Sequence, residues 1–380
     1  MAAVNPPSRA GRLPGLDVIR GLAATAVAIY HLMMLYVPLP AGPVRSIVGT
    51  WSGAVPLFFA LSAFSLLLGY AGKCWDEAGL RRFYLRRVFR IFPLFYFMLA
   101  AYLALSAARG LYVSSAEILL NLSFLFPFFP GKHESLVWAG WSLGVEVCFY
   151  TLFPITALLS RWLAASAAGL LGLGALTVAA TTVVGDLALP RSYGGMSLPA
   201  NLVYFLAGVV AFALTERAAQ AGKARRTVDW LVRWGMPLVA LSMLALFVHK
   251  FMPWAPMRKA VPKELLLALA CGLWIVVAYG GLPRWLDTAA TRFLGKLSYG
   301  IYLVHPLVLW SLHQSGVYGV IGEGIADPHL AFLACAALTL PLVVALAELG
   351  YRLVESPGMA LGERLIARFR GDARPLASPT

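Results

Sequence analysis

An aspartate, an arginine and a histidine lie in the first long apolar stretch of this 380-residue chain. In the segment L-D-V-I-R-G-L-A-A-T-A-V-A-I-Y-H, Asp17 and Arg20 precede His31. The eleven positions from Arg20 to His31 return a helix to within about 20° of its starting direction, so both side chains lie on one stripe about 16 Å apart. A neutral imidazole suits general-base catalysis, and an arginine can stabilise developing negative charge. We predict that this stripe faces a bundle interior; the alternative is a structural Asp17–Arg20 pair, with His31 merely near the outer interface.

A carboxylate lies near the start of a later apolar run, W-S-L-G-V-E-V-C-F-Y. Ser142, Glu146 and Tyr150 recur every four residues and share one helical face, and Trp141 adjoins them. A carboxylate within a membrane must be paired or protonated. Paired with the arginine or histidine of the first run, Glu146 would hold the imidazole in one tautomer. The alternative is an ion pair that only fixes helix packing.

A third polar stripe occurs in the segment L-S-Y-G-I-Y-L-V-H-P. Tyr299, Tyr302 and His305 recur every three residues. Such stripes often serve packing, and a lone histidine before proline is often satisfied by a neighbouring carbonyl. As a functional group, the stripe would line the path of an acceptor.

Arginines alternate with aromatic residues in the connector R-R-F-Y-L-R-R-V-F-R-I-F-P. Arg86, Arg87 and Arg90 lie where the chain re-enters an apolar run. Arginine forks suit phosphate recognition, so these residues are candidates to hold a nucleotide-bearing donor. The alternative is that they serve only topology and contact with anionic lipid.

The composition identifies a membrane protein. Hydrophobic residues make up 60% of the chain and charged residues 13%, with a mean hydropathy of +0.76. The net charge of +14 comes from basic residues in short connectors between apolar runs, which indicates membrane topology and not nucleic-acid binding. The cysteines are widely spaced, and we infer neither a disulfide nor a metal site. They are Cys74, Cys148, Cys271 and Cys335.

Runs of about twenty apolar residues, enough to cross roughly 30 Å of hydrocarbon, occur about ten times. They lie near residues 16–36, 53–72, 88–108, 139–159, 162–184, 197–215, 235–249, 264–282, 294–312 and 329–350. A shorter piece near 118–129 contains two prolines and is predicted to be interfacial or re-entrant. No small-residue cleavage site follows the first run, so we expect it to remain as a helix.

Alternate connectors are rich in lysine and arginine, which places those connectors and both termini in the cytoplasm. The connector with Lys250, Arg258, Lys259 and Lys263 breaks this rule. Either the weak seventh run is not a span, or these residues face anionic lipid or substrate. We therefore expect an all-α, polytopic protein with a membrane-embedded domain at 1–358 and a polar cytoplasmic tail at 359–380. No repeat or matched pair of broken helices stands out, which weakly disfavours a carrier.

The order of the motifs resembles the acyltransferase 3 family of integral membrane O-acyltransferases. The matches are L-D-x-x-R-G followed by His31, F-F-A-L-S-A-F, R-R-x-x-R-x-x-P-L-F-Y, W-S-L-x-x-E, S-Y-G-I-Y-L-x-H-P and the E-S-P at Glu355. Together they cover roughly residues 13–357. The chain departs from the family pattern at Ala63, Val147 and Cys148, which bears on packing and acceptor choice. We expect no soluble esterase-like domain of the kind fused to some members, which leaves open whether a separate partner completes the reaction.

The resemblance implies an enzyme of the bacterial cytoplasmic membrane that moves an acyl group, often acetyl, from an acyl-CoA donor to a carbohydrate or glycolipid hydroxyl, as in surface polysaccharides or lipopolysaccharide, or to an antibiotic. It implies no permanently bound cofactor or metal and gives His31 and Arg20 the essential roles. Coenzyme A would dock on the connector arginines, and Glu146 would orient His31 toward an acceptor from the outer face. The rival interpretations are a transporter or flippase of a lipid-linked glycan and a non-catalytic lipid-binding scaffold.

Overall fold

A computed structural model describes residues 13–165, 191–220, 224–251 and 262–369, except Ala71 and Cys74, together with four single residues between 166 and 190. Every regular element in this part of the chain is helical. The elements are α1 (Pro14–Leu35), α2 (Pro43–Thr50), η1 (Trp51–Gly53), α3 (Ala54–Tyr70), α4 (Glu77–Ala108), α5 (Ser115–Leu122), η2 (Phe126–Phe128), α6 (Trp141–Ala165), α8 (Arg191–Gly195), α9 (Leu198–Gln220), α10 (Ala224–Phe251), α12 (Lys263–Gly280), α13 (Ala289–Gln314), α14 (Val317–Gly324), α15 (Pro328–Gly350), the π-helix η3 (Tyr351–Glu355) and α16 (Ser356–Phe369).

Seven helical segments among the described residues are long and apolar enough to cross a membrane. They are Pro14–Leu35, Pro43–Tyr70, Glu77–Ala108, Trp141–Ser160, Ser192–Gln220, Lys263–Gly280 and Pro328–Phe369. The predicted all-helical, multi-pass membrane chain is therefore confirmed at this level.

The count of ten spans and the cytoplasmic side of the termini stay predictions. The run at 162–184 lies almost wholly outside the described residues, as do most of the basic connector after α10 and residues 370–380 of the tail. The run at 235–249 lies within α10, where Arg233–His249 forms a shorter apolar helix. The run at 294–312 lies in α13, whose polar residues face the interior.

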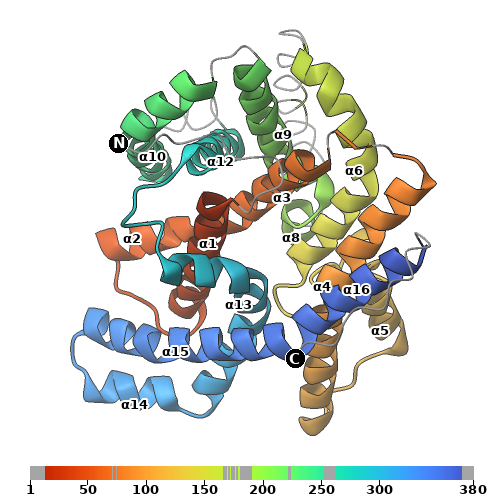
Figure 1. Cartoon of the computed structure of the whole chain (residues 1–380). Coiled ribbons are helices and arrows are strands. Elements are labelled where there is room, and N and C mark those ends of the chain that lie inside the picture. The colour runs from red at the N-terminus through yellow and green to blue at the C-terminus, as the bar shows by residue number, and fades with distance from the viewer. Residues whose placement is uncertain are drawn as a thin grey trace, which may run out of the picture.

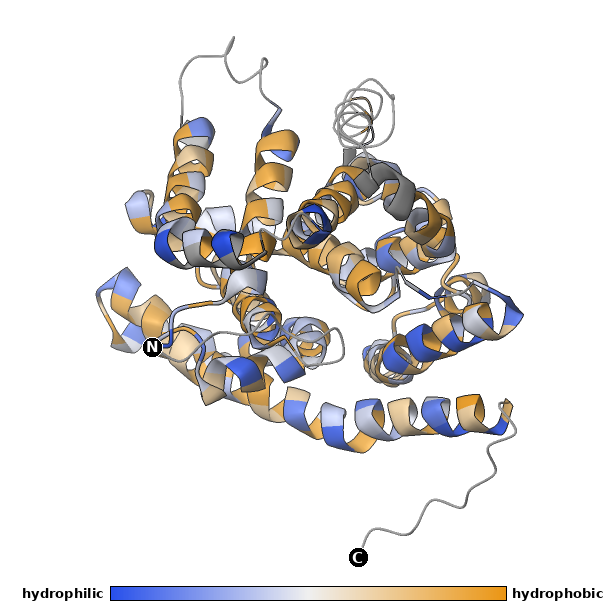
Figure 2. Ribbon diagram, turned by 45° about the horizontal axis from the view of Figure 1, so that its top comes forward, coloured by the Kyte–Doolittle hydropathy of each residue, from blue (hydrophilic) through white to orange (hydrophobic). Residues whose placement is uncertain are grey.

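The outer faces of the helices are apolar. Figure 2 shows hydrophobic residues on the outward sides of most helices as well as between them. Leu241, Leu269, Leu333 and Leu353 are among the exposed large side chains. A helix that is hydrophobic all round suits a lipid environment, so these leucines are expected to contact acyl chains.

The helices α1 and α13 form the centre of the fold and run in the same direction (Figure 1). Their backbones touch where glycines meet: a Cβ on Gly295 would lie 2.1 Å from the carbonyl oxygen of Asp17, and one on Gly21 would lie 2.5 Å from the backbone nitrogen of Gly295. Ten residues further along each helix, His31 meets His305. The close glycine contact therefore sets the register in which the two histidines face each other.

The remaining helices surround this pair. The helices α3, α9 and α12 pack together on one side, α15 covers α13 on another, and α6 packs against α3 and α9. The helix α16 crosses α4, where Gly358 and Gly362 lie against Pro93 and Phe89 too closely to admit a Cβ (Figure 1). The predicted division at 358/359 stays a prediction, and α16 runs across it.

The loop that contains α5 and η2 is fixed by its own polar contacts. Glu117 caps α5 through Ser114 and accepts a hydrogen bond from Lys132, which, with Ser114, holds the pKa of Glu117 below its usual value. Asn121 accepts hydrogen bonds from the Ser135 hydroxyl (2.6 Å) and from the backbone of Leu136 (3.0 Å). The predicted interfacial piece near 118–129 is thus the end of α5 and η2, and it braces the loop that leads to α6.

Candidate active site

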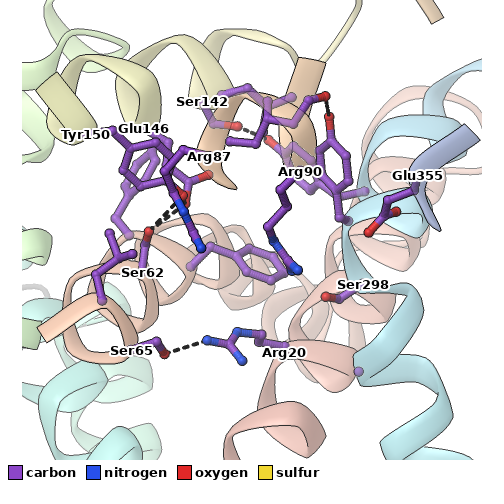
Figure 3. A pocket seen from close by; sticks show the side chains of 18 of the residues that line it. Arg20, Ser62, Ser65, Arg87, Arg90, Ser142, Glu146, Tyr150, Ser298 and Glu355 are labelled. Carbon is purple, nitrogen blue, oxygen red and sulfur yellow. Dashed lines mark hydrogen bonds between the residues drawn. The ribbon is translucent and has the colours of Figure 1, made fainter. Parts of the chain in front are cut away.

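A cavity of about 430 Å³ lies between α1, α3, α4, α6, α13 and the end of η3 (Figure 3). Most of the predicted site residues line it. These are Asp17, Arg20, Arg87, Arg90, Ser142, Glu146, Tyr150, Tyr299 and Tyr302. The sequence motifs, which lie up to 285 positions apart, therefore meet around one space.

Arg20 is fixed from two sides. Its guanidinium lies 3.3 Å from a carboxylate oxygen of Asp17 and donates to the Ser65 hydroxyl at 2.5 Å (Figure 3). The predicted pair with Asp17 exists, and the arginine also lines the cavity. Arg20 therefore faces the interior of the bundle, and its catalytic role stays a prediction.

Glu146 has different partners from those expected. Its carboxylate accepts hydrogen bonds from the hydroxyls of Ser62, at 2.6 Å, and Tyr150, at 2.5 Å (Figure 3). The expectation that Glu146 orients His31 is wrong. The two hydroxyls hydrogen-bond to the carboxylate, so the carboxylate has partners inside the protein.

The three connector arginines point to different places. Arg87 and Arg90 line the cavity, and the Nε of Arg87 is buried with no hydrogen-bond partner among the described residues (Figure 3). Arg86 is turned away, and its fork binds Glu363 of α16 at 2.7 and 3.1 Å. Its predicted role in donor binding is thus not supported by its position, because successive residues of a helix diverge by about 100°.

A buried carboxylate faces the same cavity from the end of the π-helix. Glu355 is 1% exposed, and its Oε2 has no hydrogen-bond partner among the described residues. Figure 3 shows it across the cavity from Arg90. Lys296 also lines the cavity, with its ammonium 4.1 Å from the centre of the Tyr351 ring. The cavity thus offers several cations with carboxylates among them, a lining that suits a charged, polar molecule.

Tyr302 and Ser142 form one end of the cavity. Their hydroxyls lie 2.7 Å apart, and the Tyr302 hydroxyl also lies 3.2 Å from the carbonyl of Ala139, a residue with a positive φ of 65°. Such a backbone conformation is costly for a residue with a side chain and persists only where its surroundings fix it. The conformation at this end of the cavity is therefore fixed by its hydrogen bonds.

The histidines lie next to Tyr302 and do not line the cavity. The Nδ1 of His31 lies 2.9 Å from the Nε2 of His305, and the two ring planes differ by 6°. His305 is fully buried and its ring lies 5.8 Å from that of Tyr302. Trp138, which is 39% exposed, covers His31 with a ring-centre distance of 5.3 Å.

The position of His305 differs from the expected one: it contacts His31 and does not line the cavity. Tyr299 lines the cavity and donates to the carbonyl of Ile91 at 2.6 Å. Trp141 packs edge-on against Phe59.

Sequence reasoning missed several residues of the site. Ser62 and Ser65 lie three apart in F-F-A-L-S-A-F-S, a spacing that marks one polar face on an otherwise apolar helix. Lys296 and Glu355 carried the same signal, since each is a charge within or next to an apolar run. Trp138 carried no such signal, because an aromatic residue in a loop is common.

Among the described residues, no three His, Cys, Asp or Glu side chains lie together as metal ligands. Cys148, Cys271 and Cys335 are buried and free.

A family model described as an acyltransferase domain matches residues 13–348. A "Putative acetyltransferase" of Acidianus two-tailed virus is 25% identical over 81% of this chain and 85% of its own length. A "Putative peptidoglycan O-acetyltransferase" of Bacillus subtilis is 25% identical over 94% of the chain, and a "Putative O-acetyltransferase" of Staphylococcus aureus is 26% identical over 91%. The match spans 56% and 57% of those two relatives. No solved structure matches the chain.

Proposed function

The chain belongs to the acyltransferase 3 family, and we propose that it is an integral membrane O-acyltransferase that moves an acyl group, acetyl above all, from acyl-CoA to a carbohydrate hydroxyl. The observation that carries the proposal is the cavity lined by Arg20, Arg87 and Arg90, which ends beside the His31–His305 pair. Binding and proton transfer each have a suitable place, and the two places adjoin.

The arginine end of the cavity suits the donor. Arg87 and Arg90 lie near the basic connector, which we propose faces the cytoplasm of a bacterial cell, where acyl-CoA is made. Arginine forks bind phosphate oxygens with short, charge-assisted hydrogen bonds, and the unpartnered Nε of Arg87 has such a bond to give. The phosphates of coenzyme A would therefore dock here, with the thioester extending toward Tyr302.

The chemistry at the other end is an acyl transfer. The Nε2 of His31 removes the proton from an acceptor hydroxyl as its oxygen attacks the thioester carbonyl carbon. The new carbon–oxygen bond forms, the carbon–sulfur bond breaks, and the leaving thiolate takes the proton back from His31. The products are an ester and free coenzyme A, and Arg20 stabilises negative charge on the donor or in the transition state.

The acceptor is expected to arrive from the outer side. His31 lies about 22 Å along α1 from Leu16, in the outer part of a roughly 30 Å hydrocarbon layer. The partly exposed ring of Trp138 lies beside His31 on that side. An aromatic face of this kind suits a sugar ring, which supports a carbohydrate acceptor. Its place near the outer interface supports an acceptor that arrives from that side and not from the cytosol.

The experiment is a coupled assay on protein in lipid nanodiscs. Acetyl-CoA is supplied with chitotetraose or maltotetraose, free coenzyme A is measured with a thiol reagent, and the sugar is analysed by mass spectrometry. We expect thiol release in proportion to sugar that has gained one acetyl group. A flippase would instead move a labelled lipid-linked glycan across liposomes without consuming thioester, and a scaffold would do neither; either result would overturn the proposal.

A further inference from the structure

The ring of His305 is fully buried, and which of its nitrogens carries the proton follows from one neighbour that can only accept a hydrogen bond. Its Nδ1 lies 3.1 Å from the backbone carbonyl oxygen of Ile301. A carbonyl oxygen has no hydrogen to give, so the Nδ1 of His305 carries a proton and donates it. In a neutral imidazole the Nε2 of His305 is then a lone-pair acceptor.

That acceptor faces His31. The Nδ1 of His31 lies 2.9 Å from the Nε2 of His305, the ring planes differ by 6°, and the ring centres are 5.2 Å apart, so the two nitrogens lie nearly on the line between the centres, as an in-plane N–H···N bond requires. Since the Nε2 of His305 accepts, the Nδ1 of His31 carries the proton. The lone pair of His31 is therefore left on its Nε2, the nitrogen that can take a proton from a hydroxyl.

The local sequence holds His305 in this arrangement. Pro306 follows directly and has no N–H, so the in-helix hydrogen bond to the carbonyl of Tyr302 is lost, while the carbonyl of Ile301, one residue earlier, contacts the ring. The ring is fully buried, so water does not compete for it. The glycine contact between α1 and α13, ten residues before each histidine, fixes how the two rings meet.

We propose that His305 is a positioning residue that holds His31 as the Nδ1–H tautomer and accepts a hydrogen bond from the imidazolium formed during transfer. This inference rests on the proposed function, in which His31 is the general base. When His31 gains a proton on Nε2, its Nδ1–H···Nε2 bond becomes charge-assisted and stronger. A chain of one carbonyl and two imidazoles thus replaces the carboxylate that supports the base in many hydrolases.

The kinetic test compares two substitutions of similar size. His305→Gln keeps an oxygen near the place of the Nε2 acceptor, whereas His305→Leu keeps the volume and removes the acceptor. We expect the Leu variant to lower kcat about 10- to 100-fold with an unchanged acetyl-CoA KM, and the Gln variant to recover most of that loss. The assay uses acetyl-CoA and the oligosaccharide that accepts acetyl above. Equal activity of the two variants would mean that His305 only fills space, and would overturn the proposal.

A second readout does not need activity. Nitrogen-15 magnetic resonance of histidine-labelled protein in nanodiscs distinguishes protonated from bare ring nitrogens, and His31→Gln and His305→Gln variants assign the signals. We expect both histidines as Nδ1–H tautomers, and in His305→Leu we expect the His31 signal to become a mixture of tautomers. A His31 found as the Nε2–H tautomer in the unaltered protein would overturn the positioning role. The expected tautomers without acyl transfer would instead contradict only the proposed function.

Discussion

The cavity and the histidine pair differ in what surrounds them, although they lie next to each other along α1 and α13. The cavity is a large space with loosely arranged polar groups. Ser65 binds Arg20 and Ser62 binds Glu146, whereas the Nε of Arg87 has no hydrogen-bond partner among the described residues. The histidine pair is set in tight packing, beside backbones that touch at Gly21 and Gly295. Space and spare hydrogen bonds suit binding, whereas fixed contacts suit the transfer of a proton over a short distance.

We therefore expect affinity and rate to depend on different residues. Tyr302 lines the cavity and also lies next to His305, so the two regions adjoin. Substitutions of Arg87 and Arg90 should change donor affinity first, whereas those of the histidine pair, and of Arg20 on the same stripe of α1, should change the rate of the chemical step. The predictions that follow test this separation.

The largest effect is expected from His31→Ala. Loss of a general base lowers rates by about 10²- to 10⁴-fold, while the cavity that binds the donor stays intact. Acyl transfer should fall by that amount with unchanged acetyl-CoA affinity by calorimetry. His313→Ala, on the exposed end of α13, is the control and should behave like the unaltered protein. Near-normal turnover of His31→Ala would remove the histidine from the chemistry.

Arg20→Ala is expected to lower kcat about 10²- to 10³-fold, because Arg20 lies on the His31 stripe and can meet charge that develops during transfer. Ser65→Ala removes one hydrogen bond to the same guanidinium and should cost far less. Initial-rate kinetics over a range of acetyl-CoA concentrations separate kcat from KM. A change in KM alone would move Arg20 to the binding side of the comparison.

Gly295→Ala tests the packing that sets the histidine register. The added Cβ would lie 2.1 Å from the Asp17 carbonyl, so α1 and α13 must move apart. We expect a lower melting temperature and a loss of more than about tenfold in kcat. Gly322→Ala adds the same methyl group where nothing lies within 4 Å, and should change neither. If both variants are equally active, the glycine contact does not set the register.

Arg87→Gln and Arg90→Gln are expected to raise the acetyl-CoA KM about tenfold each with little change in kcat. Each removes a charge-assisted hydrogen bond made in the ground and transition states alike. Calorimetric titration of the folded variants with coenzyme A provides the direct measurement. Unchanged affinity in both would leave these arginines as topology and lipid-contact residues.

The smallest effect is expected from Arg86→Gln. Its guanidinium already binds Glu363, and a partly exposed ion pair of this kind contributes about 1 kcal/mol or less to stability. The acetyl-CoA KM should change less than about threefold, and Glu363→Gln should match it. A tenfold rise for Arg86→Gln alone would show that this arginine turns to the donor when α16 moves.

Much of the architecture could be predicted from the sequence because it depends on local patterns. Apolar runs marked the helices, and four-residue spacing placed Ser142, Glu146 and Tyr150 on one face of α6. The stripe from Asp17 to Arg20 faces the interior as expected. Each of these conclusions needs only helical geometry and the cost of a charge in lipid.

The partners of these residues could not be predicted, because tertiary contacts decide them. His31 meets His305, 274 positions away, and not Glu146, since the glycine contact between α1 and α13 brings those two rings together. Arg86 and Arg87 are neighbours in the chain, yet only one faces the cavity. Which of the two side chains faces the cavity depends on where α16 packs on α4, and the spacing of residues in the sequence does not reveal that packing.

The glycine contact between α1 and α13 makes each helix a lever with its pivot at Gly295. From that pivot to His305 the arm is ten residues, or about 15 Å, so a tilt of about 4° between the helices moves one imidazole by about 1 Å. A displacement of that size is enough to cost about 100-fold in rate. Gly300, halfway along the arm, rests on Ala347 of α15, a helix with exposed leucines on its outer side. We therefore expect pressure from the bilayer on α15 to change the angle between α1 and α13, so that the rate of transfer varies with bilayer thickness.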